Sequence, residues 1–230
     1  MSKIDGVNVR LLAMAFMQEN FYFCSMQEIK NIIFDLGGVI INLDNKRTED
    51  AFVSLGAKNF SQFFGHGFAA SFFKEYEIGK ITDEQFIDEL KQMANLSVPD
   101  EIVINAWNAL LLDFPPERVL LLKKLKDQYR LFLFSNTNAM HLEEVQRIYG
   151  NAFENAKLDE LFERAYYSHI LGLRKPGIES FQHIIKENKL RPEETMFVDD
   201  ALINVEGANA AGLKGFYLEP GKTIVDINWG

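Results

Sequence analysis

The sequence predicts an α/β fold, in which helices cover both faces of a parallel sheet and a helical segment is inserted after the first strand. Two observations support this prediction. Short apolar runs alternate with helical patterns along most of the chain, as is typical of strand–helix–strand units. The alternation stops near residue 45 and resumes near residue 114, and no convincing strand lies between them.

Five apolar runs are expected to form the strands of a three-layer core, at residues 30–34, 131–134, 165–167, 196–198 and 215–218. Helical patterns follow or separate them at residues 116–126, 140–149, 178–187 and 202–211. Four of the predicted strands are followed at once by a polar residue. Ligands of open α/β sheets bind at the carboxyl ends of the strands, so we expect the chemistry there.

The inserted segment, residues 45–113, has helical signals of its own. Thr82 and Gln85 have the spacing of a capping box. An apolar stripe then follows at Phe86, Leu90 and Met93. A second helix is expected to start within residues 97–100, with one face made of Ile102, Val103, Ala106, Trp107 and Leu110. The aromatic-rich stretch 60–76 is also expected to be helical.

Two interpretations of this insertion remain open: helices that complete the core, or a helical cap that closes over the strand ends. We favour the cap, because it follows directly after an acidic residue at the end of the first strand. The expected division is a core of residues 26–44 and 114–230 and a cap of residues 45–113. Residues 1–25 have no clear periodicity and are treated as an N-terminal extension without an assigned role. Translation starting at Met26 is a hypothesis that mass spectrometry of the native protein would test.

Composition excludes several classes of partner. The net charge of −9 and the pI near 5.0 argue against nucleic acid, which requires clustered Lys and Arg. No apolar run approaches the roughly 20 residues of a membrane span. Cys24 is the only cysteine, which excludes an intrachain disulfide and fits a cytoplasmic location. A small-molecule partner is therefore expected, and the sequence does not predict an oligomeric state.

The first candidate site residue is Asp35, which follows a buried strand and precedes Gly37 and Gly38. One interpretation is a nucleophilic carboxylate, with glycines that let backbone amides approach a phosphate closely. The alternative is an ordinary loop aspartate that caps a turn or a helix.

Two further candidates could bind a phosphoryl group. Ser135 and Asn136 follow the second predicted strand and could offer a hydroxyl and an amide to phosphoryl oxygens, although such residues also cap helices. Lys175 precedes Pro176, whose fixed φ suits the first turn of a helix. A lysine there could neutralise a phosphate, and the alternative is a lysine on the surface.

The last candidates are the adjacent acids Asp199 and Asp200, which follow an apolar strand. Hard oxygen ligands of this kind suit Mg²⁺, and Asn204 lies four residues after Asp200, where it can face the same site. An acidic helix cap is the alternative. Each feature is weak alone, but their order along the chain, each at a strand end, is hard to produce by chance.

In these residues, within FDLGGVI, FSNTN, GLRKP and FVDDALINVEGA, the chain resembles the haloacid dehalogenase-like hydrolase superfamily from Met26 to the C-terminus. Its nearest resemblance there is to bacterial sugar phosphatases of the α-D-glucose-1-phosphate phosphatase type. The resemblance implies a Rossmann-like core with a helical cap, and Asp35 as a nucleophile that forms an aspartyl-phosphate. It also implies phosphate binding by Ser135, Asn136 and Lys175. A Mg²⁺ site is implied at Asp35, the Gly37 carbonyl, Asp199 and Asp200, with support from Asn204.

One position departs from the family pattern. Most phosphatases of the family have a second aspartate two residues after the nucleophile, as general acid for the leaving alcohol, and here that position is Gly37. The leaving group could be good enough to need no acid, or the enzyme could be inactive. Otherwise another residue donates the proton, for which His141, Glu77 and His66 are the candidates.

The expected function is a Mg²⁺-dependent phosphatase for a small phosphorylated metabolite, with a sugar phosphate as the favoured class. A 2-haloacid dehalogenase has the same fold and nucleophile but needs no metal, so the acidic pair Asp199–Asp200 argues against it. A phosphotransferase or mutase remains an alternative within the family. Gly37 also leaves open a non-catalytic module that binds a sugar phosphate or a protein.

Overall fold

The computed structural model describes residues 28–57, 60 and 71–229, and its centre is a five-stranded parallel sheet in the order β3-β2-β1-β4-β5. The strands are β1 (Asn31–Phe34), β2 (Arg130–Ser135), β3 (Arg164–Tyr167), β4 (Thr195–Asp199) and β5 (Lys214–Tyr217). Each begins and ends within one residue of the predicted apolar run. The predicted Rossmann-like α/β fold is confirmed.

The order of the strands places β1 at the centre of the sheet. Ile32 of β1 pairs with Leu131 of β2 on one side and with Met196 of β4 on the other. The chain first adds β2 and β3 on one side of β1 and then crosses to add β4 and β5 on the other. The carboxyl ends of β1, β2 and β4 therefore meet where the direction of winding changes, which is where ligands bind in such sheets.

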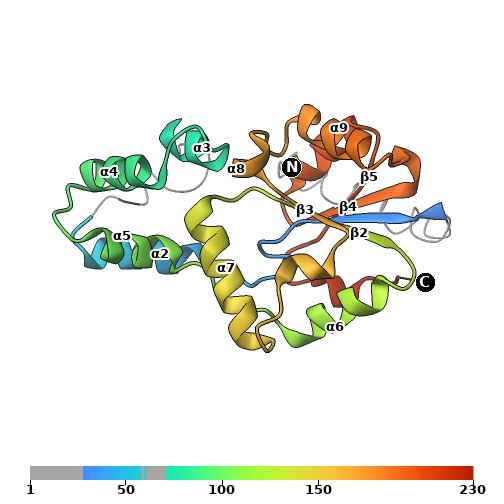
Figure 1. Cartoon of the computed structure of the whole chain (residues 1–230), viewed down its shortest axis with the longest axis horizontal. Helices are drawn as coiled ribbons and strands as arrows, with labels where there is room; N and C mark the ends of the chain where they lie inside the picture. The colour runs from blue at the N-terminus through green and yellow to red at the C-terminus, as the bar shows by residue number, and fades with distance from the viewer. Residues whose placement is uncertain (1–27, 58–59, 61–70, 230) are drawn as a thin grey trace, which may run out of the picture.

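Helices cover both faces of this sheet (Figure 1). They are α6 (Pro116–Leu125) and α7 (Ala139–Ala152) on one face, and α9 (Ile178–Glu187) and α10 (Leu202–Ala210) on the other. Successive side chains of a strand point to opposite faces. Ile32 and Phe34 accordingly join the hydrophobic cluster under α6 and α7, whereas Ile33 joins the cluster under α9 and α10. Both faces of β1 are completely buried.

Several short elements lie outside the predicted pattern, because one helical turn is too short for a periodic signal. They are η3 (Leu158–Leu161), α8 (Ser168–Leu171), η4 (Pro192–Glu194) and η5 (Ile224–Asp226). The expectation that Pro176 belongs to a first helical turn is wrong, because α9 begins at Ile178 with Gly177 as its N-cap.

The inserted segment forms α2 (Asn45–Ser54), α3 (Ser71–Glu77), α4 (Asp83–Ala94) and α5 (Asp100–Asn108), which extend to one side of the sheet (Figure 1). These helices share a hydrophobic cluster rich in aromatic rings, in which Tyr76 stacks on Phe86 at 4.1 Å between ring centroids. Met140 of α7 is the buried residue that the sheet domain adds to this cluster. The inserted helices therefore pack around a hydrophobic core of their own.

The capping box of α4 is confirmed, since Thr82 Oγ1 accepts from Gln85 N and Gln85 Oε1 accepts from Thr82 N. Helix α5 begins at Asp100, within the predicted range 97–100, after Pro99, which provides no side-chain cap. One detail of this helix differs from the prediction. Ile102 is 40% exposed and lies off the buried face, because that face is centred on Val103 and Trp107.

Some predictions fall on parts of the chain that the structure does not describe. The N-terminal extension 1–25 and His66 lie outside the described residues. Of the aromatic stretch 60–76, residues 71–76 are helical as part of α3 and residues 61–70 lie outside. None of the described helices is long and apolar enough to cross a membrane.

Candidate active site

The carboxyl ends of the central strands bring the predicted acidic and basic residues together. Asp35 follows β1 directly, and Asp199 is the last residue of β4. Lys175 comes from the loop before α9, and its Nζ lies 2.7 Å from Asp35 Oδ1 and 2.7 Å from Asp199 Oδ2. One lysine thus joins the ends of two strands that are neighbours in the sheet but far apart in the sequence.

Lys175 is almost completely buried, at 1% exposure. Burial alone would lower its pKa, but the charges of Asp199 and Asp35 outweigh burial and raise the pKa above its usual value. The side chain is therefore a cation fixed between two carboxylates. A buried cation in this position can neutralise an anion that approaches Asp35.

Asp35 is held from two sides. Its Oδ1 accepts a hydrogen bond from Leu36 N at 2.6 Å and contacts Lys175. Burial raises the pKa of Asp35 to about 7, and Lys175 opposes that rise, while Asp199 adds to it. The charge of Lys175 therefore offsets only part of the effect of burial on the pKa of Asp35.

Three carboxylates form a cluster at this point. Oxygens of Asp35, Asp199 and Asp200 all lie within 4.8 Å of one another. Burial and the neighbouring Asp199 raise the pKa of Asp200. Three acids with one lysine leave an excess of negative charge, and carboxylate oxygens at this spacing suit Mg²⁺. No described residue donates a hydrogen bond to the Gly37 carbonyl, which is thus available as a further oxygen ligand.

Asp199 is the most firmly held member of the cluster. It is fully buried, and its Oδ1 accepts from Ala201 N at 2.7 Å. Asn204 Nδ2 donates to both of its carboxylate oxygens, at 3.2 and 3.1 Å. Asn204 therefore orients Asp199 rather than Asp200.

Gly38 lies directly against the carboxylate of Asp200. Its φ is +72°, and a Cβ at this position would lie 2.1 Å from Asp200 Oδ2. Glycine is thus required both by the left-handed backbone and by the space that Asp200 occupies.

The two residues at the end of β2 have separate tasks. Ser135 is 3% exposed, and its Oγ forms no hydrogen bond within the described part of the chain, so it is free to meet an anion. The side chain of Asn136 instead holds the backbone of Lys175: Oδ1 accepts from Lys175 N at 2.9 Å and Nδ2 donates to Lys175 O at 3.0 Å. Only the backbone amide of Asn136 remains to serve an anion.

Comparison with known proteins accords with this geometry. Residues 29–212 match the family described as haloacid dehalogenase-like hydrolases. The chain belongs to this family. The prediction made from the four sequence segments is confirmed.

Relatives within the haloacid dehalogenase-like family include phosphatases. The D-ribitol-5-phosphate phosphatase of Bacteroides thetaiotaomicron is 29% identical over 84% of this chain and 93% of its own length. A family enzyme of the same organism, solved as a variant with magnesium and inorganic phosphate, is 34% identical and superposes with a TM-score of 0.79 over 84% of this chain and 96% of its own. A predicted family hydrolase from Porphyromonas gingivalis is 29% identical, with a TM-score of 0.77 over 85% and 93% of the two chains. These relatives agree with the predicted phosphoric monoester hydrolase and its magnesium cofactor.

None of the described candidates for the missing proton donor is free. Both ring nitrogens of His141 lie near partners, with Nδ1 3.0 Å from Asn138 Nδ2 and Nε2 3.2 Å from Trp107 O. The ring also stacks on Trp107 at 4.7 Å, and burial lowers the pKa of His141 to about 4. Glu77 contacts Arg174: Oε2 lies 2.8 Å from Nη2, and although burial raises the pKa of Glu77, the Arg174 charge opposes this.

Sequence reasoning missed two residues at this boundary, Trp107 as the partner of His141 and Arg174 as the partner of Glu77. Arg174 is the residue directly before Lys175, so its position beside a catalytic candidate was the available signal.

Proposed function

We propose that this member of the haloacid dehalogenase-like family is a Mg²⁺-dependent phosphatase that hydrolyses a small phosphorylated metabolite through an aspartyl-phosphate on Asp35. The observation that carries the proposal is the position of Lys175, whose ammonium group contacts both Asp35 and Asp199 beside the three-carboxylate cluster. A dianionic phosphoryl group that approaches Asp35 meets this fixed cation at once. Such electrostatic stabilisation is the main device of phosphoryl transfer.

The residues that would hold Mg²⁺ are Asp35, Asp199 and Asp200 with the Gly37 carbonyl. When bound, the ion would neutralise charge on the phosphoryl oxygens. Asn204 would keep Asp199 oriented toward it. The excess of acids over bases in the cluster supports this assignment.

The chain's own residues would carry the reaction as follows. An oxygen of Asp35 attacks phosphorus, the Asp35 O–P bond forms, and the bond from phosphorus to the leaving oxygen breaks. Lys175 neutralises one phosphoryl oxygen, while the Ser135 hydroxyl and the Asn136 backbone amide donate hydrogen bonds to the others. Water then attacks phosphorus, releases inorganic phosphate and restores Asp35. We assign His141 to holding the cap against α7, because both of its ring nitrogens are engaged.

The substrate class that we propose is a phosphorylated sugar or polyol. The D-ribitol-5-phosphate phosphatase supports it, because its similarity covers 84% of this chain. A glyceraldehyde 3-phosphate phosphatase from Pyrococcus furiosus, 28% identical over 114 residues, is also named for a small polar phosphate. The test is a screen of the purified protein against phosphorylated sugars, polyols and unrelated metabolites. Preference for a nucleotide or a phosphorylated amino acid would contradict this class.

The activity itself is tested with p-nitrophenyl phosphate, whose leaving group needs little protonation. We expect release of phosphate with Mg²⁺, none with EDTA, and none from the Asp35→Asn variant, whose fold circular dichroism would verify. Turnover that persists in EDTA, or in Asp35→Asn, would remove the metal or Asp35 from the mechanism.

A further inference from the structure

An ion pair connects the cap to the loop that carries Lys175. Glu77 is the last residue of α3 in the cap, and Arg174 precedes Lys175 in the core. Their charged groups are 2.8 Å apart, and each side chain is about one-third exposed, at 33% for Arg174 and 31% for Glu77. A partly buried pair is screened less by salt than an ion pair on the open surface.

The turn that follows Glu77 also lies against the core. Gly79 has φ +68°, and a Cβ there would lie 2.2 Å from the carbonyl oxygen of His169 in α8. Figure 1 shows α3 beside α8, in agreement with this close approach. One residue before Glu77, the Tyr76 hydroxyl accepts a hydrogen bond from Met140 N of α7 at 3.3 Å. The end of α3 is thus a docking point on the core.

The loop around Lys175 is held differently on its core side. Asn136 bonds both backbone groups of Lys175. Gly207 of α10 lies against Pro176 so closely that a Cβ would come within 2.3 Å of the Pro176 carbonyl oxygen. The core therefore holds the Lys175 loop on one side. On the other side, Glu77 of the cap contacts Arg174, the residue before Lys175.

We propose that Glu77 and Arg174 form a latch, an ion pair that holds the cap closed over the active site. Both are positioning residues in this role. This inference rests on the proposed phosphatase function, because it assigns the latch to the closed, reactive state of that site. Closure of a cap excludes water and completes the arrangement of groups around a substrate. The ion pair with Arg174 occupies the carboxylate of Glu77, which assigns Glu77 to holding the cap rather than to donating a proton.

The first experiment separates a latch from a proton donor. We expect Glu77→Gln and Arg174→Gln each to lower kcat/KM about tenfold, as the loss of a charge-assisted contact implies. The factor should be the same for p-nitrophenyl phosphate and for alkyl phosphates, because the latch acts before any bond breaks. The double variant Glu77→Arg, Arg174→Glu should recover most of the loss. An effect of Glu77→Gln that grows with leaving-group pKa, or a swap that restores nothing, would overturn the latch.

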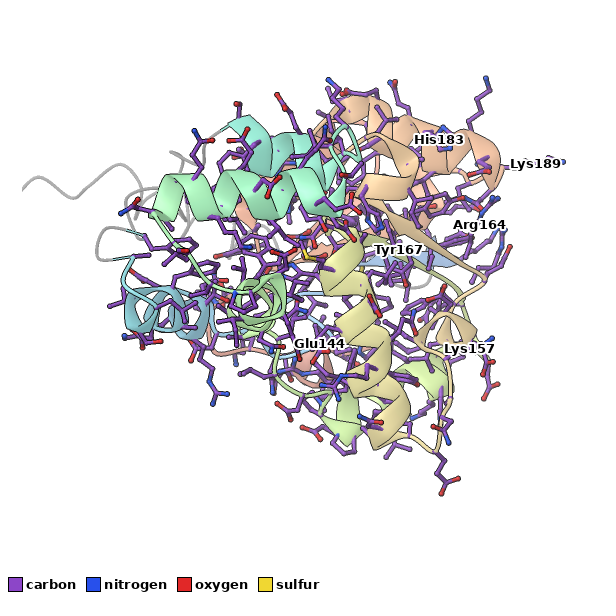
Figure 2. All side chains as sticks on the ribbon, turned by 60° about the vertical axis from the view of Figure 1, so that its left-hand side comes forward. Glu144, Lys157, Arg164, Tyr167, His183 and Lys189 are labelled. Carbon is purple, nitrogen blue, oxygen red and sulfur yellow. The ribbon has the colours of Figure 1, made fainter. Side chains whose placement is uncertain are left out.

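The matched control is Glu144→Gln. Glu144 forms an ion pair with Arg147 on the same helix α7 and is labelled in Figure 2. The substitution removes the same charge as Glu77→Gln, but the ion pair that it breaks lies within one helix and does not connect the cap to the core. We therefore expect kcat/KM to remain within twofold, a change of about 0.4 kcal/mol or less. A tenfold loss in this control would show that any ion pair matters equally and would contradict the proposal.

A second variant tests the docking of the turn by shape instead of charge. Gly79→Ala forces a Cβ against the His169 carbonyl and should displace the cap. Gly221→Ala is its control, because Gly221 has a similar positive φ, +81°, yet a Cβ there meets nothing within 4 Å. We expect Gly79→Ala to lower kcat/KM more than about tenfold and Gly221→Ala to leave it within twofold. Equal effects of both would refute docking at Gly79.

Hydrogen–deuterium exchange measures the latch without any turnover. In Glu77→Gln, the amides of residues 77–81 and 172–177 should exchange faster than in the wild type, whereas Glu144→Gln should not alter them. If exchange is unchanged in Glu77→Gln, the latch is wrong even if the phosphatase is right. If the wild-type protein hydrolyses no phosphate, the proposed function fails, and the exchange result still decides whether the cap is latched.

Discussion

Replacing Gly37 with an aspartate should place a carboxyl group where most phosphatases of the family have their general acid. Gly37 has no left-handed backbone, so a side chain can be accepted there. A Cβ at this position would lie 2.6 Å from Leu43 Cδ1, which is the end of a flexible side chain in a residue that is 37% exposed. Rotation of Leu43 toward solvent relieves this contact at a cost of about 1 kcal/mol.

The gain should exceed that cost. General acid catalysis contributes about 10²–10⁴-fold, which corresponds to roughly 3–5 kcal/mol of activation free energy. Gly37→Asp should therefore raise kcat/KM for alkyl phosphates, whose leaving alkoxides need a proton. It should leave p-nitrophenyl phosphate within a few fold, because that leaving group departs without one.

The assay is a plot of log kcat/KM against the pKa of the leaving alcohol or phenol. The wild-type plot should fall steeply, and the Gly37→Asp plot should be flatter. Gly37→Ala is the control, because it adds the same Cβ next to Leu43 without a carboxyl group. A flat wild-type plot would mean that another group already donates the proton. Parallel shifts of all substrates in both variants would mean that the new side chain acts only through packing.

Three other predictions concern the charged groups and the glycine of the site. Lys175→Met leaves Asp35 and Asp199 facing each other without the cation, so urea unfolding in EDTA should show a loss of about 3–5 kcal/mol; an unchanged free energy of unfolding would contradict this. Gly38→Ala should weaken Mg²⁺ binding at least about tenfold by calorimetry, because its Cβ would collide with Asp200 Oδ2; an unaltered Kd would refute the contact. Burial lowers the pKa of His141 from 6.5 to about 4, so the folded protein binds fewer protons than the unfolded chain in this range. As the pH falls from 6.5 toward 4, the wild type should therefore lose stability relative to His141→Gln, by no more than about 3 kcal/mol. Asp35, whose raised pKa has the opposite effect, contributes equally to both proteins.

The strands, and the polar residues at their carboxyl ends, could be located from the sequence because each is marked by a local pattern. A buried parallel strand is a short apolar run, and the residue after it lies at the carboxyl edge wherever the strand is placed in the sheet. Asp35 and Asp199 could therefore be assigned to one edge from the sequence alone. Lys175 could be assigned there through its position before α9, even though the expected helical role of Pro176 was wrong.

Contacts between distant segments could not be predicted in this way. The stacking of His141 on Trp107 joins residues 34 positions apart, and nothing near either residue in the sequence indicates the other. The sequence did not predict that the side chain of Asn136 bonds the Lys175 backbone, which lies 39 positions away in the chain. The ion pair of Glu77 is of the same kind, since it depends on where the cap lies over the core.

The latch and the missing acid can be separated by combining their substitutions. Gly37 lies in the loop after β1 beside Leu43, whereas Glu77 lies at the end of α3 and pairs with Arg174. Substitutions at independent sites have additive effects, within about 0.3–0.5 kcal/mol. The double variant Gly37→Asp, Glu77→Gln should therefore gain on alkyl phosphates the same factor that Gly37→Asp gains alone, starting from a rate about tenfold lower. A loss from Glu77→Gln that disappears in the Gly37→Asp background would have another meaning, because it would identify Glu77 as the proton donor that the new carboxyl group replaces.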